Sequence, residues 1–360
     1  MVFSKAIKRL LTLLFMSIAM TTLVLSLTAS NILEITLIDV GQGESILIVT
    51  PENRTILIDA GQDYRFFSIY KTLKSKDINR IDILISTHPD YDHYGGLFDV
   101  LKYFEVGTVY VSGIETSDIY YMNFVSEVYN KGIKSILARA GNSYNFGSVT
   151  FTFVSPGVTL PTDDNDASVV MHLSYRNFSA LFTADISSKR ERHLLDHNAL
   201  TPITVLKVSH HGSKDATSDA FLNVTKPKYA LISVGEENKF GHPSDLVLSR
   251  LEKAGAEIFR TDYHGNITVW TDGDQVKITT TKDPPLSRSG EETIPSAGLP
   301  EPTLYVTNPS HKYVASIKSG VFHYPSCSAA QNIFISNLIT FETRDEAIAS
   351  GRRPCRLCNP

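Results

Sequence analysis

The sequence predicts an α/β protein, made of one large α/β domain and a small α+β unit at the C-terminus. The first observation is size and composition, because 360 residues with 42% hydrophobic and 20% charged side chains allow a sizeable buried core. The second is a succession of short apolar strands and helical stretches over roughly residues 32–275. The third is a change after Lys282, where prolines and serines replace the apolar periodicity.

Strands are expected where short runs of apolar and β-branched residues are bounded by glycine, proline or polar turns. These runs are residues 34–39, 45–50, 55–59, 81–86, 108–111, 149–154, 169–175, 179–183, 205–208, 229–234, 257–261 and 267–271. Helices are expected between them, at residues 66–74, 96–102, 120–131, 188–195, 216–224 and 245–254. Strands and helices mixed along one continuous stretch indicate a single α/β domain.

The first 30 residues are typical of an export signal. Lys5, Lys8 and Arg9 precede an apolar run over residues 10–27, and small polar residues follow it. Residues 1–30 are therefore predicted to be a signal peptide. The alternative is an uncleaved N-terminal anchor, since the run approaches the roughly 20 residues that span a bilayer. Either way the protein is expected to be secreted, or extracytoplasmic and membrane-anchored.

The rest of the chain divides by composition into three segments. Residues 31–282 form the predicted α/β domain, and residues 283–303 read as a linker rich in proline and serine. Residues 304–360 form a unit too small to be stable by apolar burial alone, so a bound metal would help it to fold. The net charge of −4 excludes an overall basic field but leaves the partner open.

Residues 88–93 hold four side chains of the kinds that bind metal ions, namely His88, Asp90, Asp92 and His93. They directly follow the apolar run at residues 83–85, so they are expected in a loop at a strand end and at the start of the next helix. Two pairs of imidazole and carboxylate donors suit two divalent cations. The alternative, a polar surface loop, does not account for four such residues in six.

This segment resembles the signature of the metallo-β-lactamase superfamily, His-x-His-x-Asp-His followed by glycine, with Asp90 at the second histidine position. Together with residues 37–45, 58–61 and 207–213 it is similar to the hydrolase domain of the ComEC family of competence DNA-uptake proteins and its soluble relatives. The resemblance covers about residues 32–275 and implies a four-layer αββα sandwich with two divalent cations. No run of transmembrane helices accompanies it, so the channel function of ComEC is not implied.

The resemblance also implies metal contacts outside this segment. Asp185 would bridge the two cations, with Ala184 where relatives more often have glycine, and a plain helix cap is the alternative for Asp185. His210 is predicted to be a ligand, with His211 supporting it from behind. Asp166 is a further candidate ligand, with a turn residue as the alternative.

Two late histidines match family motifs and are predicted to be catalytic together with Asp92. His242 would contact a phosphate or leaving group, and His264 would stabilise the transition state or act as the last metal ligand; an exposed loop is the alternative for both. Asp92 is expected to hold and orient the attacking water. Because Asp90 adds an oxygen donor, manganese or magnesium becomes a candidate beside zinc.

The cysteines all lie near the C-terminus and suggest a second metal site. Cys327, Cys355 and Cys358 join His323 in a His-x3-Cys and Cys-x2-Cys spacing, the ligand set of a closed tetrahedral zinc site. The alternative is a disulfide between Cys355 and Cys358 that leaves Cys327 free.

The surrounding residues 312–360 resemble the zinc-binding domain of the DNA-repair protein Ada, with one structural zinc implied. In Ada the first ligand is the cysteine that accepts a methyl group, and His323 stands there, so methyl transfer is not implied. Arginines at 344, 352, 353 and 356 and lysines at 312 and 318 make the unit locally basic, which favours a grip on DNA phosphates over a purely structural role.

The predicted function is an exported metal-dependent hydrolase with two cations, zinc or manganese, that cleaves phosphodiesters in DNA or another nucleic acid. A first alternative is hydrolysis of a lactone, a β-lactam or a wall-polymer phosphodiester, because fold and metal set do not fix the substrate. A second is a non-catalytic DNA-binding accessory of DNA uptake.

Overall fold

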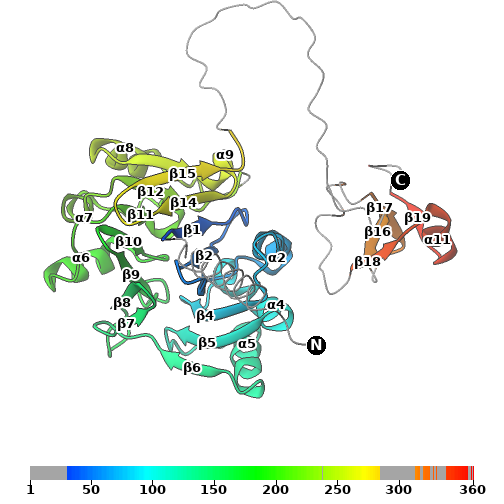
Figure 1. Ribbon diagram of the computed structural model, residues 1–360, viewed down its shortest axis with the longest axis horizontal. Helices are drawn as coiled ribbons and strands as arrows, with labels where there is room; N and C mark the ends of the chain where they lie inside the picture. The colour runs from blue at the N-terminus through cyan, green and yellow to red at the C-terminus, as the bar shows by residue number, and fades with distance from the viewer. Residues whose placement is uncertain are drawn as a thin grey trace, which may run out of the picture.

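Two β-sheets lie face to face in the N-terminal part of the chain, with helices on the outer side of each (Figure 1). This computed structural model describes residues 31–236 and 238–283, and of the C-terminal unit residues 313–316, 319–324, 327, 330, 338–355, 358 and 360. The arrangement confirms the predicted αββα sandwich.

The first sheet has eight strands in the order β15-β14-β1-β2-β3-β4-β5-β6. Alternation of side chains fixes its faces, since in β2 Ile46 and Ile48 point to the inter-sheet core and Leu47 points to the helices. The pairs β3–β4, β4–β5 and β5–β6 are parallel. The strands are β1 (Leu33–Leu37), β2 (Ile46–Val49), β3 (Thr55–Ile58), β4 (Arg80–Ser86), β5 (Glu105–Val111), β6 (Lys134–Leu137), β14 (Ile267–Thr271) and β15 (Val276–Thr280).

The second sheet has seven strands in the order β13-β12-β11-β10-β9-β8-β7. Strands β10 to β13 run parallel to one another, so their carboxyl ends meet at one edge. The strands are β7 (Ser143–Phe146), β8 (Val149–Ser155), β9 (Val170–Tyr175), β10 (Phe178–Phe182), β11 (Val205–Lys207), β12 (Tyr229–Ile232) and β13 (Glu257–Arg260).

Three apolar clusters hold these layers together. One lies between the sheets and includes Ile83, Ile85, Phe151 and Phe153. A second packs the helices α2 (Phe66–Lys74), α4 (Leu97–Tyr103) and α5 (Ile119–Asn130) on the first sheet. The third packs α6 (Ser188–Asp196), α7 (Asp219–Thr225) and α8 (Asp245–Lys253) on the second. Serine N-caps start these last three helices, at Ser187, Ser218 and Ser244.

The expected strands and helices are present, with ends shifted by a few residues, and the structure adds strands β6, β7 and β15. Strand β7 forms one edge of the second sheet, and its residues are exposed or half-buried. Such an edge strand carries no apolar run, which explains why the sequence pattern did not predict it. Short turns of helix that the sequence pattern also missed are η1 (Asp63–Arg65), η2 (Ser209–Gly212) and α9 (Thr261–His264). Asp92 and His93, expected at the start of the next helix, lie in a separate short helix, α3 (Tyr91–Tyr94).

The C-terminal unit is a small four-stranded sheet with one helix. The strand order is β18-β16-β17-β19, and Phe322, Phe341 and Ala347 form part of its core. Its elements are β16 (Tyr313–Ser316), β17 (Val321–His323), β18 (Leu338–Phe341), α11 (Arg344–Ala349) and β19 (Arg353–Pro354).

The predicted export signal at residues 1–30 and the predicted linker at residues 283–303, apart from Asp283, lie outside the described residues. Among the helices that the structure describes, none is both long and apolar enough to cross a bilayer.

Candidate metal centre

The candidate site lies where the carboxyl ends of parallel strands from the two sheets meet. Strands β3 and β4 lead into Asp59 and His88, while β10 and β11 lead into Asp185 and His211. Side chains in the loops at this edge of an α/β sheet lie beyond the hydrogen-bonded strands and can converge on one place. The segment at residues 88–93 stands at this edge, as the sequence predicted.

The structure brings the four residues of this segment to the same spot from a loop and a short helix. His88 lies in the loop after β4, and its Nε2 is 3.6 Å from Asp90 Oδ2. Asp90 is the N-cap residue of α3, which carries Asp92 and His93. Gly43 packs against this turn, because a Cβ added there would lie 2.3 Å from the backbone oxygen of Asp92.

Asp185 stands at the centre of the donors. Its Oδ2 lies 3.3 Å from His93 Nε2, 3.2 Å from His211 Nε2 and 3.7 Å from His210 Nε2. Three sets of residues have donor atoms that lie within 4.8 Å of one another inside the set. Asp185, His93 and His211 each belong to two of these sets, which are His88/His93/Asp185, Asp92/His93/His211 and Glu44/Asp185/His211. A carboxylate common to two donor sets is placed to bridge two cations.

The structure places His211, rather than His210, in these donor sets. His210 and His211 both adopt left-handed backbone angles, with φ of 50° and 53°, and this turn directs His211 inward. Its side chain is 2% exposed, whereas that of His210 is 31% exposed and lies at the rim. Backbone strain of this kind costs about 1–3 kcal/mol per residue and is common at functional sites.

Hydrogen bonds fix which nitrogen each imidazole turns toward the centre. Asp59 binds His93 Nδ1 at 2.7 Å and Thr87 Oγ1 at 2.6 Å, and Thr87 Oγ1 lies 2.9 Å from His88 Nδ1. His211 Nδ1 donates to the carbonyl of Ser233 at 2.8 Å. Such outer contacts hold the tautomer that leaves Nε2 as the metal-binding atom.

The atoms left over fit a metal site. His88 Nε2, His93 Nε2, His211 Nε2 and Asp185 Oδ1 are buried and accept or donate no hydrogen bond within the described part of the chain. Buried polar atoms without partners are costly, so several that converge on one place indicate a bound cation. The donor chemistry, imidazole nitrogen and carboxylate oxygen, suits zinc or manganese.

Electrostatics keep the carboxylates in the form that binds a cation. Burial alone would raise the pKa of Asp185, but the imidazoles of His211 and His93 hold it well below its usual range. Asp92 likewise has a lowered pKa, because the charges and hydrogen bonding of His211 and His93 outweigh burial. Against the effect of burial, Asp185 raises the pKa of His211 to about 9, so cation binding must displace a proton there.

A buried ion pair between strand β11 and the loop before β2 supports the centre. Lys207 Nζ pairs with Glu44, donates to the carbonyl of Ala184 at 3.1 Å and lies 3.7 Å from Asp185 Oδ1. Although burial alone would lower it, the carboxylates of Glu44 and Asp185 raise the pKa of Lys207. With neutral histidines, the carboxylates at residues 44, 59, 90, 92 and 185 and this lysine leave four negative charges, which two divalent cations would neutralise.

Lys207→Met should lower the free energy of unfolding by about 3–5 kcal/mol, because it leaves the buried Glu44 carboxylate without its cation. Urea denaturation at neutral pH measures the loss. The double variant Glu44→Gln/Lys207→Met, which removes both charges, should recover most of it. Equal losses in the single and double variants would show that the pairing contributes nothing.

Besides His210, four predicted site residues lie outside the donor sets. The first is Asp90, whose side chain is 45% exposed and lies near His88 alone among these donors. Asp166 Oδ1 accepts hydrogen bonds from the backbone N–H of Ser187 at 3.0 Å and its hydroxyl at 2.7 Å, so the structure uses it to fix the start of α6. His264 Nδ1 lies 2.9 Å from the carbonyl of Arg260 in the turn after β13. His242 is closer to the centre, with its ring 5.8 Å from that of His210.

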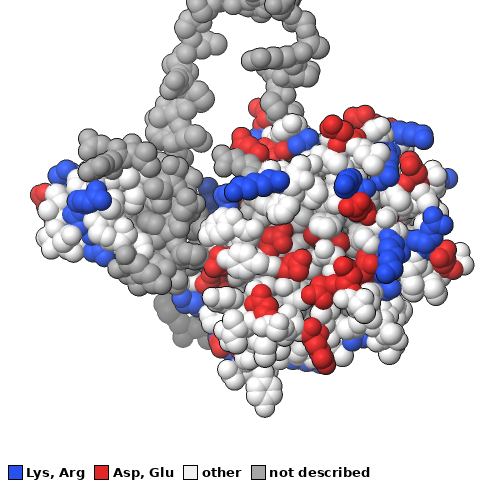
Figure 2. Space-filling model, turned by 180° about the vertical axis from the view of Figure 1, so that it is seen from behind, with Lys and Arg blue, Asp and Glu red and all other residues white. Residues whose placement is uncertain are grey.

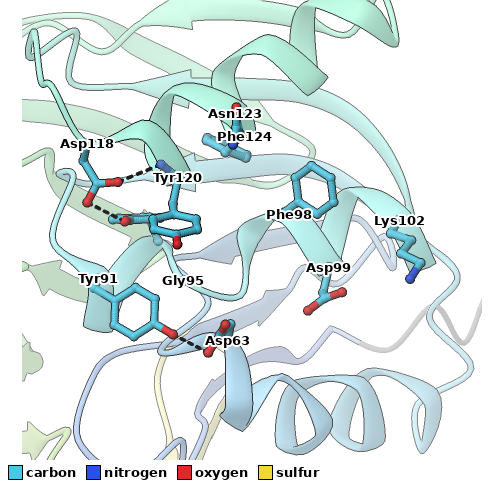
Figure 3. A pocket seen from close by; sticks show the side chains of 11 residues that line it. Asp63, Tyr91, Gly95, Phe98, Asp99, Lys102, Asp118, Tyr120, Asn123 and Phe124 are labelled. Atoms are coloured by element: carbon cyan, nitrogen blue, oxygen red, sulfur yellow. Dashed lines mark hydrogen bonds between the residues drawn. The ribbon is translucent and has the colours of Figure 1, made fainter. Parts of the chain in front are cut away.

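A cavity of about 710 Å³ flanks the other side of α3 (Figure 3). Its walls combine aromatic rings with carboxylates and one lysine, and the hydroxyl of Tyr91 binds Asp63. The lining residues are Asp63, Tyr91, Tyr94, Gly95, Phe98, Asp99, Lys102, Asp118, Tyr120, Asn123 and Phe124. Three carboxylates against one lysine make this flank unfavourable for a polyanion.

The C-terminal unit brings together the second predicted ligand set. One donor atom each of His323, Cys327, Cys355 and Cys358 lies within 4.8 Å of the others. His323 Nδ1 is buried without a hydrogen bond in the described part, and no disulfide joins the cysteines. These four donors fit a tetrahedral zinc ion.

Comparison with known families agrees with both sites. A model of the metallo-beta-lactamase superfamily matches residues 38–236. The chain belongs to the metallo-beta-lactamase superfamily. A model of the metal-binding domain of Ada matches residues 308–360, and this domain binds zinc.

Three curated relatives of this superfamily member are ComEC-type competence proteins. It is 28% identical to ComE operon protein 3 of Bacillus subtilis over 251 residues, 65% of this chain and 32% of that protein. It is 30% identical to Competence protein ComA of Neisseria gonorrhoeae over 233 residues, 64% of this chain and 31% of that one. Recombination protein 2 of Haemophilus influenzae is 29% identical over 245 residues, 67% and 29% of the two chains. The chain thus spans about a third of the length of these relatives.

Similarity to solved structures is low. The metallo-beta-lactamase fold protein YhfI from Bacillus subtilis shares 12% identity at a TM-score of 0.45, over 68% of this chain and 99% of that one. A diphosphatase from the PhnP family shares 14% identity at a TM-score of 0.34, over 56% and 86%. The fold assignment rests on the two sheets and the superfamily match.

Several residues of the centre were not assigned a role from the sequence, namely Glu44, Asp59, Thr87 and Lys207. Glu44, Asp59 and Lys207 stand within the motifs at residues 37–45, 58–61 and 207–213, and Lys207 also interrupts the apolar run at residues 205–208. Charged residues at these positions were the available signal. Thr87 gave none, because its role depends on the adjacency of β3 and β4.

Proposed function

We propose that this hydrolase is an exported phosphodiesterase that cleaves DNA or another nucleic acid. The observation that carries the proposal is the group of three imidazoles and three carboxylates around Asp185, which suits two cations acting on a phosphate ester. The names of the relatives support the nucleic acid, since they refer to competence and recombination. Asp90 favours manganese or magnesium beside zinc.

The residues of the metal centre would have distinct roles in this reaction. Bound cations would supply a Lewis acid and lower the pKa of a coordinated water. Asp92, 26% exposed and beside His211, would orient that water toward the phosphorus. His210 and His242 stand together at the rim and would contact the phosphate or the departing oxygen. Asp59 holds His93 directly and His88 through Thr87.

Purified protein loaded with manganese, magnesium or zinc should cleave fluorescently labelled DNA or RNA. The same preparations are offered a lactone, a β-lactam and a wall-polymer phosphodiester. Preferential turnover of one of these would replace nucleic acid as the substrate. DNA binding without turnover of any substrate would instead identify a non-catalytic accessory of DNA uptake.

Export is a separate part of the proposal and rests on the composition of residues 1–30. Cell fractionation with N-terminal sequencing of the mature protein distinguishes a cleaved signal from an anchor. Protein found only in the cytoplasm would contradict export.

The C-terminal unit is proposed to bind nucleic acid phosphates through its exposed arginine side chains. Arg344 Nε donates to the carbonyl of Pro360, and Arg352 donates to Ser350, so both are partly engaged within the unit. Arg353 is exposed. Figure 2 shows lysine or arginine side chains gathered on one face of this unit.

Removal of residues 304–360 should leave turnover of a small phosphodiester within about twofold but weaken binding to long DNA. Each lost phosphate contact should lower the slope of log affinity against log salt by about 0.9 for duplex DNA. Fluorescence anisotropy at several salt concentrations measures both chains, and Arg353→Gln in the full chain is the matched single-charge control. Coinciding slopes would show that the unit does not hold DNA, and lost small-substrate turnover would contradict the two-domain division.

A further inference from the structure

An exposed phenylalanine stands at the mouth of the metal centre, on a loop between β12 and α8. The ring of Phe240 is 69% exposed and lies nearly parallel to that of His242, at 5.9 Å and 19°. The ring of His242 is in turn 5.8 Å from that of His210, whose Nε2 lies 3.7 Å from Asp185 Oδ2. A series of aromatic rings therefore leads from the surface to the central carboxylate.

The loop is held in one shape by its own hydrogen bonds. The amide of Asn238 donates to the carbonyls of Gly235 at 3.1 Å and His242 at 2.7 Å. Its Oδ1 accepts from the backbone N–H of Phe240 at 3.3 Å and of His242 at 3.0 Å. The backbone that carries Phe240 is thus fixed before any ligand binds, which lowers the entropy cost of stacking on the ring.

The same loop packs directly on the turn that carries the metal-site histidines. Gly212 has a φ of +85°, and a Cβ added there would lie 2.5 Å from Pro243 Cβ. Ser244 donates its backbone N–H to the carbonyl of Gly212 at 2.9 Å. Phe240 therefore keeps a fixed place relative to His210 and His211, as a group that positions substrate must.

The surroundings of Phe240 favour a ligand that joins a flat ring to an anion. Its neighbours Asn238, Lys239 and His242 are polar, so the ring is not part of an apolar patch that another protein would cover. The exposed lysines nearby in sequence, Lys239 and Lys214, are matched by the exposed acids Glu236 and Asp215, so the attraction for an anion would come from cations in the metal centre. A nucleotide offers both parts, a base to stack and a phosphate to pair.

We propose that Phe240 is a stacking platform for an unpaired base next to the scissile phosphate, which makes single-stranded nucleic acid the substrate. The inference rests on the proposed nuclease function and specifies its substrate class. In a duplex each base is already stacked on both faces by its neighbours, whereas a single strand has flexible bases that stack on aromatic side chains.

The test compares Phe240→Ala with Phe240→Trp and with Tyr129→Ala, an 84% exposed aromatic of α5 that serves as the matched control. The substrates are labelled oligothymidylate, an abasic strand of the same length and a duplex. Phe240→Ala should raise KM for oligothymidylate by about 5- to 150-fold with little change in kcat, because stacking of one base is lost. The wild-type protein and Phe240→Ala should cleave the abasic strand equally well. Phe240→Trp should keep a KM for oligothymidylate as low as that of the wild type, and so should Tyr129→Ala.

Each other outcome has a distinct meaning. Equal KM increases for oligothymidylate and the abasic strand, or no increase at all, would overturn the stacking platform and leave the nuclease proposal intact. A wild-type preference for duplex would overturn the single-strand assignment. A wild-type protein that turns over a non-nucleic-acid substrate but no strand would overturn the nuclease proposal, and the inference with it. Unchanged thermal unfolding of Phe240→Ala excludes a folding defect.

Discussion

Asp92→Asn should lower kcat/KM for a phosphodiester by at least about 10³-fold while the protein stays folded. The amide keeps the volume of the side chain but loses the charge that Asp92 directs toward His211 Nε2, 3.4 Å away. Loss of 10³ in rate corresponds to about 4 kcal/mol of transition-state stabilisation, the size expected for a group that binds cation or water. Steady-state kinetics at saturating manganese or zinc measures the change.

His88→Ala should have a similar effect, because its buried Nε2 is one of the atoms left for a cation. His197→Ala is the matched control, since this exposed histidine at the C-terminal end of α6 belongs to none of the donor sets. Metal content by mass spectrometry and the thermal unfolding midpoint are measured alongside. A double His88→Ala/Asp92→Asn protein that keeps wild-type turnover with metal present would refute the catalytic assignment.

The sequence was most informative where chemistry and periodicity coincide. The apolar run of β4 ends at Ser86, and the ligand-type residues 88–93 follow at once, so both the strand end and the metal site could be predicted. The sandwich itself followed from the resemblance. Composition and periodicity alone indicated only an α/β domain.

The contacts that orient the donors could not be predicted, because they depend on which strands are neighbours. Asp59 reaches Thr87 only because β3 pairs with β4 in parallel. Lys207 and Glu44 meet because β11 of the second sheet faces the loop before β2 of the first. Neither contact can be predicted from the residues that are adjacent in sequence.

Backbone conformation decided the assignments at the two histidines and at Ala184. Only the left-handed turn at residues 209–212 shows that His211 points inward while His210 stays at the rim. Ala184 has a φ of 46°, a region that glycine adopts without strain, which gives a physical reason for the glycine that the resemblance leads one to expect there.

Cys355→Ser should release the zinc of the C-terminal unit and unfold that unit, while the hydrolase domain stays folded. The unit buries only two small apolar clusters in its described part, one of which is largely the ligand cysteines themselves. Binding of a structural zinc contributes about 10–16 kcal/mol in small zinc domains, far more than clusters of this size supply. Amide hydrogen exchange of residues 313–360, together with zinc content, measures the loss.

Thr340→Ala, at an exposed position of β18 in the same sheet, is the matched control and should keep both the zinc and the protection of these amides. A chelator added to the wild-type protein should reproduce the effect of Cys355→Ser in this unit. Loss of a ligand and loss of the metal both remove the coordination that joins His323, Cys327, Cys355 and Cys358. Thermal unfolding of the hydrolase domain in Cys355→Ser should match that of wild type within about 1 °C, since that domain has its own three apolar clusters. Persistent amide protection in the zinc-free unit would show that apolar packing alone folds it, and a parallel loss of hydrolase stability would show that the two parts fold together.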